Sequence, residues 1–369
     1  MAETPRTGNG RRAGLAGWHG VLAWSDANRR RQGALLDLLG LGPERTPSRV
    51  VFARPGVRLR AFGEPRAGHG PVLLIVPAPI KRFYIWDLLP AVSVVRHCLD
   101  GGVRVYGAEW SDPVGPAVRY GLADYADRLL GECIDAMAAE TGVSAPMVTG
   151  HSLGGTLAAI FTSLNPERVR ALTLLEAPLR FGKEVGAFAP LLAVAPRPNG
   201  FDGEAPPIPG SLLNLASLMA APDAFLLERW SDWAASLPDY QALRTHLRVE
   251  RWTLDEYPMP ARLFAGVVED LYRGDHFRRG TLEIGRRRAA LAAIACPIQI
   301  VADPRSRVIP PSSVVPEAGS VASNDARVLR YEGDRGVALQ HVGALVGRNA
   351  HQRLWPEIIR WMRARWNGA

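Results

Sequence analysis

The order of apolar and polar positions along the chain predicts buried strands separated by amphipathic helices. Residues 71–76 read Pro-Val-Leu-Leu-Ile-Val, an unbroken aliphatic run typical of a parallel strand that is buried on both faces. Similar runs predict strands at 103–110, 146–149 and 169–175. Helices with apolar residues at spacings of three and four are predicted between the strands, at 87–99, 124–141 and 153–164. This alternation predicts an α/β fold with a doubly wound, mostly parallel sheet and a site at the carboxyl ends of its strands.

Two regions depart from this alternation. Residues 1–45 are rich in Arg and Gly, with one predicted helix at 27–39. Between residues 181 and 291 the strand pattern stops and tryptophans accumulate, which predicts a mainly helical cap inserted between strands 6 and 7 of the sheet. We therefore divide the chain into an N-terminal arm (1–45), a first part of the core (46–180), a cap (181–291) and a second part of the core (292–369).

The remaining elements complete this core. Arg54-Pro55-Gly56 is a turn signature, and it predicts a hairpin between the extended runs 49–53 and 57–62. After the cap, strands are predicted at 297–302 and 327–331, followed by a terminal helix at 353–366.

Composition narrows the function classes. With 47% hydrophobic and 22% charged residues the chain is typical of a globular protein, and no apolar run reaches the ~18 residues of a membrane span. The N-terminus has no apolar segment typical of a secretory signal, and the three cysteines are too few for a disulfide framework, so we expect a cytoplasmic protein. The net charge of +8 comes from scattered arginines, which does not favour nucleic acid as a partner.

One motif carries chemistry. Gly150-His151-Ser152-Leu153-Gly154 matches G-x-S-x-G and lies directly between a predicted strand and a predicted helix, which is the setting of the nucleophile elbow of α/β hydrolases. A serine at this position would also suit a helix N-cap. The context favours Ser152 as a nucleophile, because its neighbours are the glycines that a strained strand-to-helix turn needs.

A serine nucleophile requires a base and an oxyanion hole. In α/β hydrolases the histidine follows the last strand, and His341 has that position here. The oxyanion hole needs two backbone N–H donors, one from Leu153 and one from the loop after residues 71–76. Pro77 and Pro79 lack an N–H, so the second donor is Ala78 or Ile80, and we favour Ala78.

Six segments of the chain carry a family pattern, namely residues 74–88, 109–113, 121–125, 150–156, 252–258 and 340–347. The first of them contains Phe-Tyr-Ile-x-Asp-Leu, which α/β hydrolases in general do not share. Together the segments resemble the polyhydroxyalkanoate synthases and the related intracellular polyhydroxybutyrate depolymerases, over roughly residues 45–366. The resemblance implies an α/β-hydrolase fold and an enzyme that forms or cleaves 3-hydroxyacyl esters through a covalent acyl-enzyme.

The sequence departs from the family pattern at two positions. The family nucleophile is normally Cys, and here it is Ser152, which moves the expectation from acyl transfer toward hydrolysis. Ser306 occupies the position of the usual strand-7 acid, and a serine cannot supply a carboxylate. The acid that orients His341 must therefore come from elsewhere, and we expect Glu176, at the end of the strand 169–175. The other candidate is Asp303, which would need a remodelled turn.

The predicted function is a serine-dependent ester hydrolase acting on hydroxyacid esters such as polyhydroxyalkanoate oligomers. One alternative is a synthase-like acyltransferase that uses hydroxyacyl-CoA, and another is a non-catalytic granule-associated protein. No metal or redox cofactor is implied. The partners considered are a small-molecule or polymeric ester, the surface of a polyhydroxyalkanoate granule and a second copy of the chain.

Overall fold

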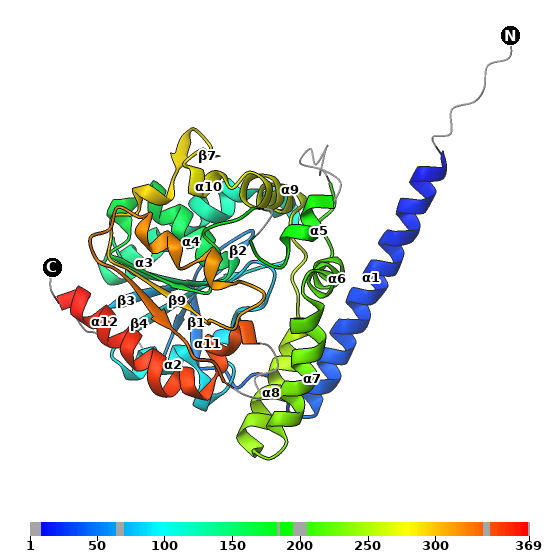
Figure 1. The fold of residues 1–369 in the computed structure, drawn as a ribbon, viewed down its shortest axis with the longest axis horizontal. Helices are drawn as coiled ribbons and strands as arrows, with labels where there is room; N and C mark the ends of the chain where they lie inside the picture. The colour runs from blue at the N-terminus through cyan, green and yellow to red at the C-terminus, as the bar shows by residue number, and fades with distance from the viewer. Residues whose placement is uncertain (1–8, 64–69, 183–184, 195–204, 335–339, 368–369) are drawn as a thin grey trace, which may run out of the picture.

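A sheet of eight strands forms the centre of the molecule (Figure 1). The computed structural model describes residues 9–63, 70–182, 185–194, 205–334 and 340–367. The strand order is β1-β2-β4-β3-β5-β6-β9-β10, and every pair from β4 onward in this order is parallel, whereas β1 and β2 are antiparallel. The strands are β1 (Ser48–Arg54), β2 (Val57–Phe62), β3 (Val72–Val76), β4 (Arg104–Trp110), β5 (Met147–His151), β6 (Ala171–Leu175), β9 (Ile298–Ala302) and β10 (Ala326–Arg330). The chain therefore has the α/β-hydrolase fold that its sequence predicts.

Helices cover both faces of the sheet because its central strands bury both of their faces. In β3, Val72, Leu74 and Val76 face one apolar cluster, whereas Leu73 and Ile75 face the other. The first cluster includes α3 (Leu129–Thr141) and α4 (Leu153–Leu164), and the second includes α2 (Val94–Asp100) and α12 (Trp355–Asn367). All five residues of β3 are fully buried, which explains the continuous aliphatic run in the sequence.

The β1–β2 hairpin adds an antiparallel edge to the parallel sheet. Val57, the first residue of β2, pairs with Trp110, the last residue of β4. The turn between β1 and β2 therefore lies at the carboxyl end of the parallel strands. This is the edge at which the functional groups of a doubly wound sheet gather.

The segment between β6 and β9 is mainly helical and contains one short hairpin. Its helices are α5 (Ala189–Val194), α6 (Gly210–Ala220), α7 (Glu228–Ser236), α8 (Tyr240–Thr253), α9 (Ala261–Gly266) and α10 (His276–Arg279). The hairpin consists of β7 (Leu282–Ile284) and β8 (Arg287–Ala289), which form a separate two-stranded sheet. Figure 1 shows α5 to α8 along one side of the central sheet.

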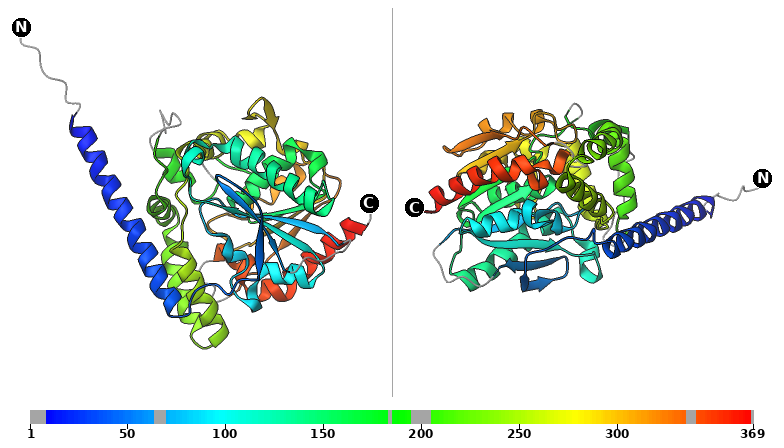
Figure 2. Two further views of the ribbon diagram at one scale, coloured as in Figure 1. Left: turned by 180° about the vertical axis from the view of Figure 1, so that it is seen from behind. Right: turned by 90° about the horizontal axis from the view of Figure 1, so that it is seen from below.

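Helix α1 (Asn9–Leu38) runs beside α6 and α8, and its N-terminal end extends beyond the rest of the fold (Figure 2). Its contacts with this helical segment include hydrogen bonds to two aspartates of α1. Asp26 accepts hydrogen bonds from the backbone and side chain of Ser211, and Asp37 accepts two from Arg251, at 2.7 and 2.8 Å. Hydrogen bonds to Asp26 and an ion pair at Asp37 thus link the arm to this segment.

Two helices differ from their predicted bounds. The predicted helix at 27–39 begins at Asn9 instead, 18 residues earlier. The predicted helix at 87–99 is wrong over its first half, because Pro90 disfavours a helical conformation for Leu89, which is extended. The regular helix α2 begins only after Ser93, whose hydroxyl accepts a hydrogen bond from the Arg96 N–H.

Among the described residues, no single helix has both the length and the apolar composition of a membrane span. One bent pair, Gly210–Ala220 with Asp223–Ser236, meets that criterion when its two helices are taken together, across a bend of 105°.

Candidate active site

Ser152 occupies a sharp turn between β5 and α4. Its backbone has φ 54° and ψ −136°, a conformation that costs a non-glycine residue ~1–3 kcal/mol. Close contacts explain the glycines around it, because a Cβ on Gly154 would lie 2.4 Å from the Val76 carbonyl oxygen, and one on Gly150 would lie 2.6 Å from the Gly155 Cα. The sequence folds here as a tight elbow that holds the serine away from the strand axis.

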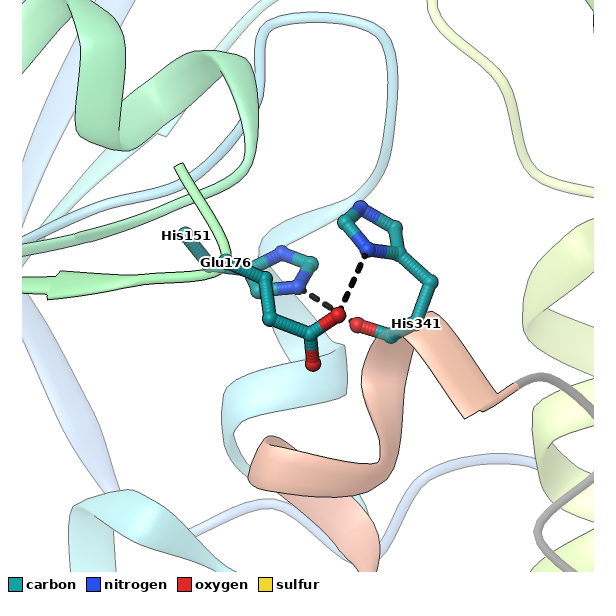
Figure 3. Close-up of side chains that lie close together, drawn as sticks. All are labelled: His151, Glu176 and His341. Carbon is teal, nitrogen blue, oxygen red and sulfur yellow. Dashed lines mark hydrogen bonds and ion pairs between the residues drawn. The ribbon is translucent and has the colours of Figure 1, made fainter. Parts of the chain in front are cut away.

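His341 and Glu176 meet at the same end of the sheet. Glu176 directly follows β6, and His341 lies in the turn Gln340–Val342 after β10. The His341 Nδ1 donates to Glu176 Oε2 at 3.3 Å, as Figure 3 shows. Glu176 also has a positive φ of 44°, which places a second strained residue beside the elbow. A bond at Nδ1 leaves the Nε2 lone pair of a neutral imidazole free to accept a proton.

Burial keeps both members of this pair toward their neutral forms. Burial lowers the pKa of His341 to about 4, so that the imidazole is neutral at pH 7. Burial and the nearby negative charge of Asp303 raise the pKa of Glu176 well above its usual value. A proton on His341 is therefore stabilised only when Glu176 is ionised, because its negative charge then compensates the positive charge of the imidazolium.

Asp303, the other predicted acid, has different partners. Its carboxylate accepts a hydrogen bond from the Arg305 N–H at 2.8 Å and lies 3.4 Å from the Arg305 guanidinium. Ser306, at the position of the usual strand-7 acid, interacts through its hydroxyl with Glu176 and lowers the pKa of that carboxyl. Ser306 thus lies beside the Glu176 carboxylate, which follows β6, and of the two candidate acids Glu176 is the one that contacts His341.

His151 is a site residue that the sequence analysis did not single out. Its Nε2 donates to the His341 carbonyl oxygen at 2.8 Å, and the two rings lie 4.5 Å apart between centroids. Burial and the neighbouring His341 lower the pKa of His151 well below its usual value, so it acts as a neutral donor. Its position directly before Ser152 in the elbow motif is the feature of the sequence that could have identified it as a site residue. The contact fixes the backbone of the turn that carries His341.

The predicted oxyanion-hole residues lie on two segments that touch. Leu153 is the first residue of α4, so its N–H has no acceptor inside the helix. Ala78 lies in the loop after β3, and Trp110 Nε1 donates to the Pro77 carbonyl oxygen at 2.7 Å, which fixes that loop. Leu153 and Ala78 both line the cavity that contains Ser152 and His341.

This cavity measures about 220 Å³ and is mainly apolar. Part of its wall comes from the segment between β6 and β9, so this segment lies beside the cavity that Ser152 also lines. The apolar residues that it contributes include Phe188, Leu213, Phe225, Trp252 and Phe264. An apolar cavity with few polar groups suits the acyl part of an ester.

A charged cluster forms one wall of the cavity. Glu256, whose side chain is 4% exposed, accepts hydrogen bonds from Lys81 and Asn214 on one oxygen and from Arg29 of α1 on the other. Lys81 and Arg29 also donate to the Thr253 carbonyl oxygen. The long sequence separation of these residues hides this cluster from sequence analysis.

The ligand atoms of His151, Glu176 and His341 all lie within 4.8 Å of one another. Such a group has the donor types of a metal site. Here, however, Nδ1 of His341 is bonded to Glu176, and Nε2 of His151 is bonded to a backbone carbonyl. These contacts orient the His341 ring, and Glu176 Oε1 has no hydrogen-bond partner among the described residues.

The elbow, the His341–Glu176 pair and the sheet order define the class of protein. The sequence profile of the α/β-hydrolase fold matches residues 9–193, half of the chain, and the chain belongs to this family. It is an enzyme of the hydrolase or acyltransferase type.

Its relatives include poly(3-hydroxyalkanoate) polymerase subunits PhaC. The subunit of Haloarcula marismortui is 26% identical over 341 residues, which span 88% of this chain and 69% of that protein. The subunit of Allochromatium vinosum is 25% identical over 331 residues, or 87% of this chain and 89% of that protein. Among solved structures, the monoacylglycerol lipase of Paleococcus ferrophilus matches with a TM-score of 0.50 and 13% identity, covering 84% of this chain and 99% of the lipase, and supports the fold alone.

Proposed function

We propose that this protein is a serine-dependent ester hydrolase that acts through an acyl-enzyme on hydroxyacid esters such as polyhydroxyalkanoate oligomers. The observation that carries the proposal is the arrangement of Ser152, His341 and Glu176. Ser152 and His341 line one apolar cavity, and Glu176 contacts His341 at 3.3 Å from a neighbouring strand. Nucleophile, base and orienting acid are the three parts that acyl transfer to serine needs.

The first half-reaction transfers the acyl group to the enzyme. Ser152 Oγ attacks the ester carbonyl while His341 Nε2 accepts the hydroxyl proton, and Glu176 stabilises the imidazolium that forms. The backbone N–H groups of Leu153 and Ala78 stabilise the developing oxyanion. The carbon–oxygen bond of the ester then breaks, and the proton on His341 passes to the leaving oxygen.

The second half-reaction returns the enzyme to its starting state. Water gives a proton to His341 Nε2 and attacks the acyl carbonyl, and the bond to Ser152 Oγ breaks as the oxygen recovers its proton. The product is the free hydroxyacid. An acyltransferase would use the same residues but pass the acyl group to an alcohol in place of water.

The chemistry of the nucleophile favours hydrolysis over polymerisation. A cysteine thiolate exchanges acyl groups readily with a thioester, because the bonds broken and formed are of the same type. Transfer from a thioester to serine gives an oxygen ester, the acyl-enzyme that hydrolases form and then cleave with water. The relatives named polymerase subunits support a hydroxyalkanoate substrate, and Ser152 supports water as the acceptor.

The test combines covalent labelling with product analysis. Intact mass after treatment with a fluorophosphonate should increase by the mass of one adduct. Ser152→Ala should abolish the adduct and reduce turnover by several powers of ten while the protein remains folded. The wild type should then convert a hydroxybutyrate oligomer to free hydroxybutyrate. Chain growth with release of CoA from hydroxybutyryl-CoA would instead identify an acyltransferase, and the absence of any adduct would identify a non-catalytic protein.

A further inference from the structure

A second cavity, of about 880 Å³, lies at the same edge of the sheet as Ser152. It is formed by the β1–β2 turn, the carboxyl end of β4 and the loop after β3. Five arginines line it, namely Arg45, Arg54, Arg58, Arg60 and Arg82. We call it the arginine-lined cavity.

The charges in this cavity do not cancel. Its lining includes only three carboxylates, and each already has a partner. Glu109 is shared by Arg60 at 2.7 Å and Arg45 at 3.8 Å, and Asp255 is bound by Arg251 at 2.8 Å. The third, Asp112, lies 3.6 Å from Arg82.

Among the arginines of this cavity, Arg58 is the one best placed to bind an anion. It is exposed on β2 and has no ion pair with any residue that the structure describes. It shares one face of β2 with Arg60, two residues along the strand. The net positive charge and the free guanidinium favour a ligand that carries an oxyanion.

Arg82 lies between this cavity and the acyl cavity, because it lines both, so the two cavities are neighbours. Its guanidinium lies 3.7 Å from the centre of the Tyr257 ring, which fixes the arginine at the boundary between them. An ester seated at Ser152 has two sides, an acyl side and a leaving-group side. The apolar cavity suits the first, so the arginine-lined cavity is the place for the second.

We propose that the arginine-lined cavity binds the negatively charged end of the group that Ser152 displaces from its substrate. The inference rests on the proposed function. Oγ bonds to the acyl carbon, and the carbon–oxygen bond of an ester, or the carbon–sulfur bond of a thioester, breaks. The leaving oxygen or sulfur takes the proton from His341, and the oxyanion at the far end of the leaving group is unchanged. In a hydroxyacid oligomer this oxyanion is the terminal carboxylate. In an acyl thioester of a phosphorylated carrier it is a phosphate.

The test compares substrates that differ only in this charge. One pair is a hydroxybutyrate oligomer with a free carboxylate and the same oligomer capped as a methyl ester. The other pair is hydroxybutyryl-phosphopantetheine and hydroxybutyryl-pantetheine, which lacks the phosphate. The readout is the ratio of kcat/KM between the charged and uncharged member of each pair, because this ratio is insensitive to the fraction of folded enzyme.

The wild type should favour the charged member of one pair by about tenfold, since a hydrogen bond to a charged group contributes at least one decade of affinity. The pair that shows the preference identifies the leaving group. Arg58→Ala should bring the ratio close to one, and high salt should reduce it. Arg288→Ala is the matched control, because Arg288 is an exposed strand arginine that lines neither cavity, and it should leave the ratio unchanged. A ratio near one for both pairs, or a preference that survives Arg58→Ala, would overturn the proposal.

Binding to an inactive protein separates this inference from the proposed function. Calorimetry with Ser152→Ala should detect hydroxybutyrate or CoA, and the added Arg58→Ala change should weaken the binding about tenfold. If turnover proves independent of Ser152 while this binding is present, the hydrolase proposal fails and the anion site stands. If neither anion binds, the anion site fails.

Discussion

Replacing Glu176 by Gln should reduce turnover by three to four powers of ten. At the 3.3 Å between His341 Nδ1 and Glu176 Oε2, a carboxylate stabilises an imidazolium by about 5 kcal/mol at an effective dielectric constant of 20. Since each 1.36 kcal/mol corresponds to a tenfold change in rate, this energy amounts to about 10³–10⁴-fold. The amide can also present its NH₂ to Nδ1 and favour the imidazole tautomer that cannot accept the serine proton.

The assay is kcat for an activated butyrate ester, measured beside Asp303→Asn. That second variant should stay within about tenfold of wild type, because the Asp303 carboxylate contacts Arg305 and leaves the His341–Glu176 bond in place. Glu176→Gln should unfold at an equal or higher temperature than wild type above neutral pH, since it removes a buried carboxyl whose pKa is raised. A crippled Asp303→Asn beside a near-normal Glu176→Gln would refute this assignment of the acid.

Two other predictions follow from the same site. Because Glu176 must be ionised to stabilise the imidazolium, kcat/KM should increase with pH through the pKa of Glu176. The negative charge of Asp303 helps to raise this pKa, so Asp303→Asn should move the acidic limb of the kcat/KM profile to lower pH. A shift of that limb to higher pH would contradict the argument. Gly154→Ala would place a Cβ 2.4 Å from the backbone of the loop after β3 and should lower stability by about 1–3 kcal/mol. Gly20→Ala lies inside α1 with no atom within 4 Å, so it should leave the melting temperature equal or higher. A Gly154→Ala variant that melts at the wild-type temperature would refute the packing argument.

The strands were the easiest part of the fold to predict from the sequence. The run at residues 71–76 corresponds to β3 (Val72–Val76) within one residue, because a strand buried on both faces leaves no room for polar side chains. The first half of α1 was missed because glycines at positions 10, 14, 17 and 20 lower the intrinsic helix propensity by about 1 kcal/mol each.

The site was partly accessible from the sequence. The elbow motif placed Ser152 at the carboxyl edge of the sheet, and chain order placed His341 there. The choice between Glu176 and Asp303 depends on which strand end turns toward the histidine, and no local pattern encodes this. The five arginines of the second cavity lie on three separate segments, so only the sheet pairing of β2 with β4 reveals that they meet.

The attachment of α1 makes the pocket wall depend on a segment that lies outside the sheet. Arg29 supplies one of the two cations that neutralise Glu256, and Asp37 accepts two of the guanidinium bonds of Arg251 in α8. A chain cut before residue 46 would keep every strand and the whole Ser152–His341–Glu176 group, yet it would leave Arg251 without Asp37 and Glu256 with Lys81 as its one remaining cation among the described residues. A proteolytic cleavage far from the serine would in this way act directly on the shape of the cavity that receives the substrate.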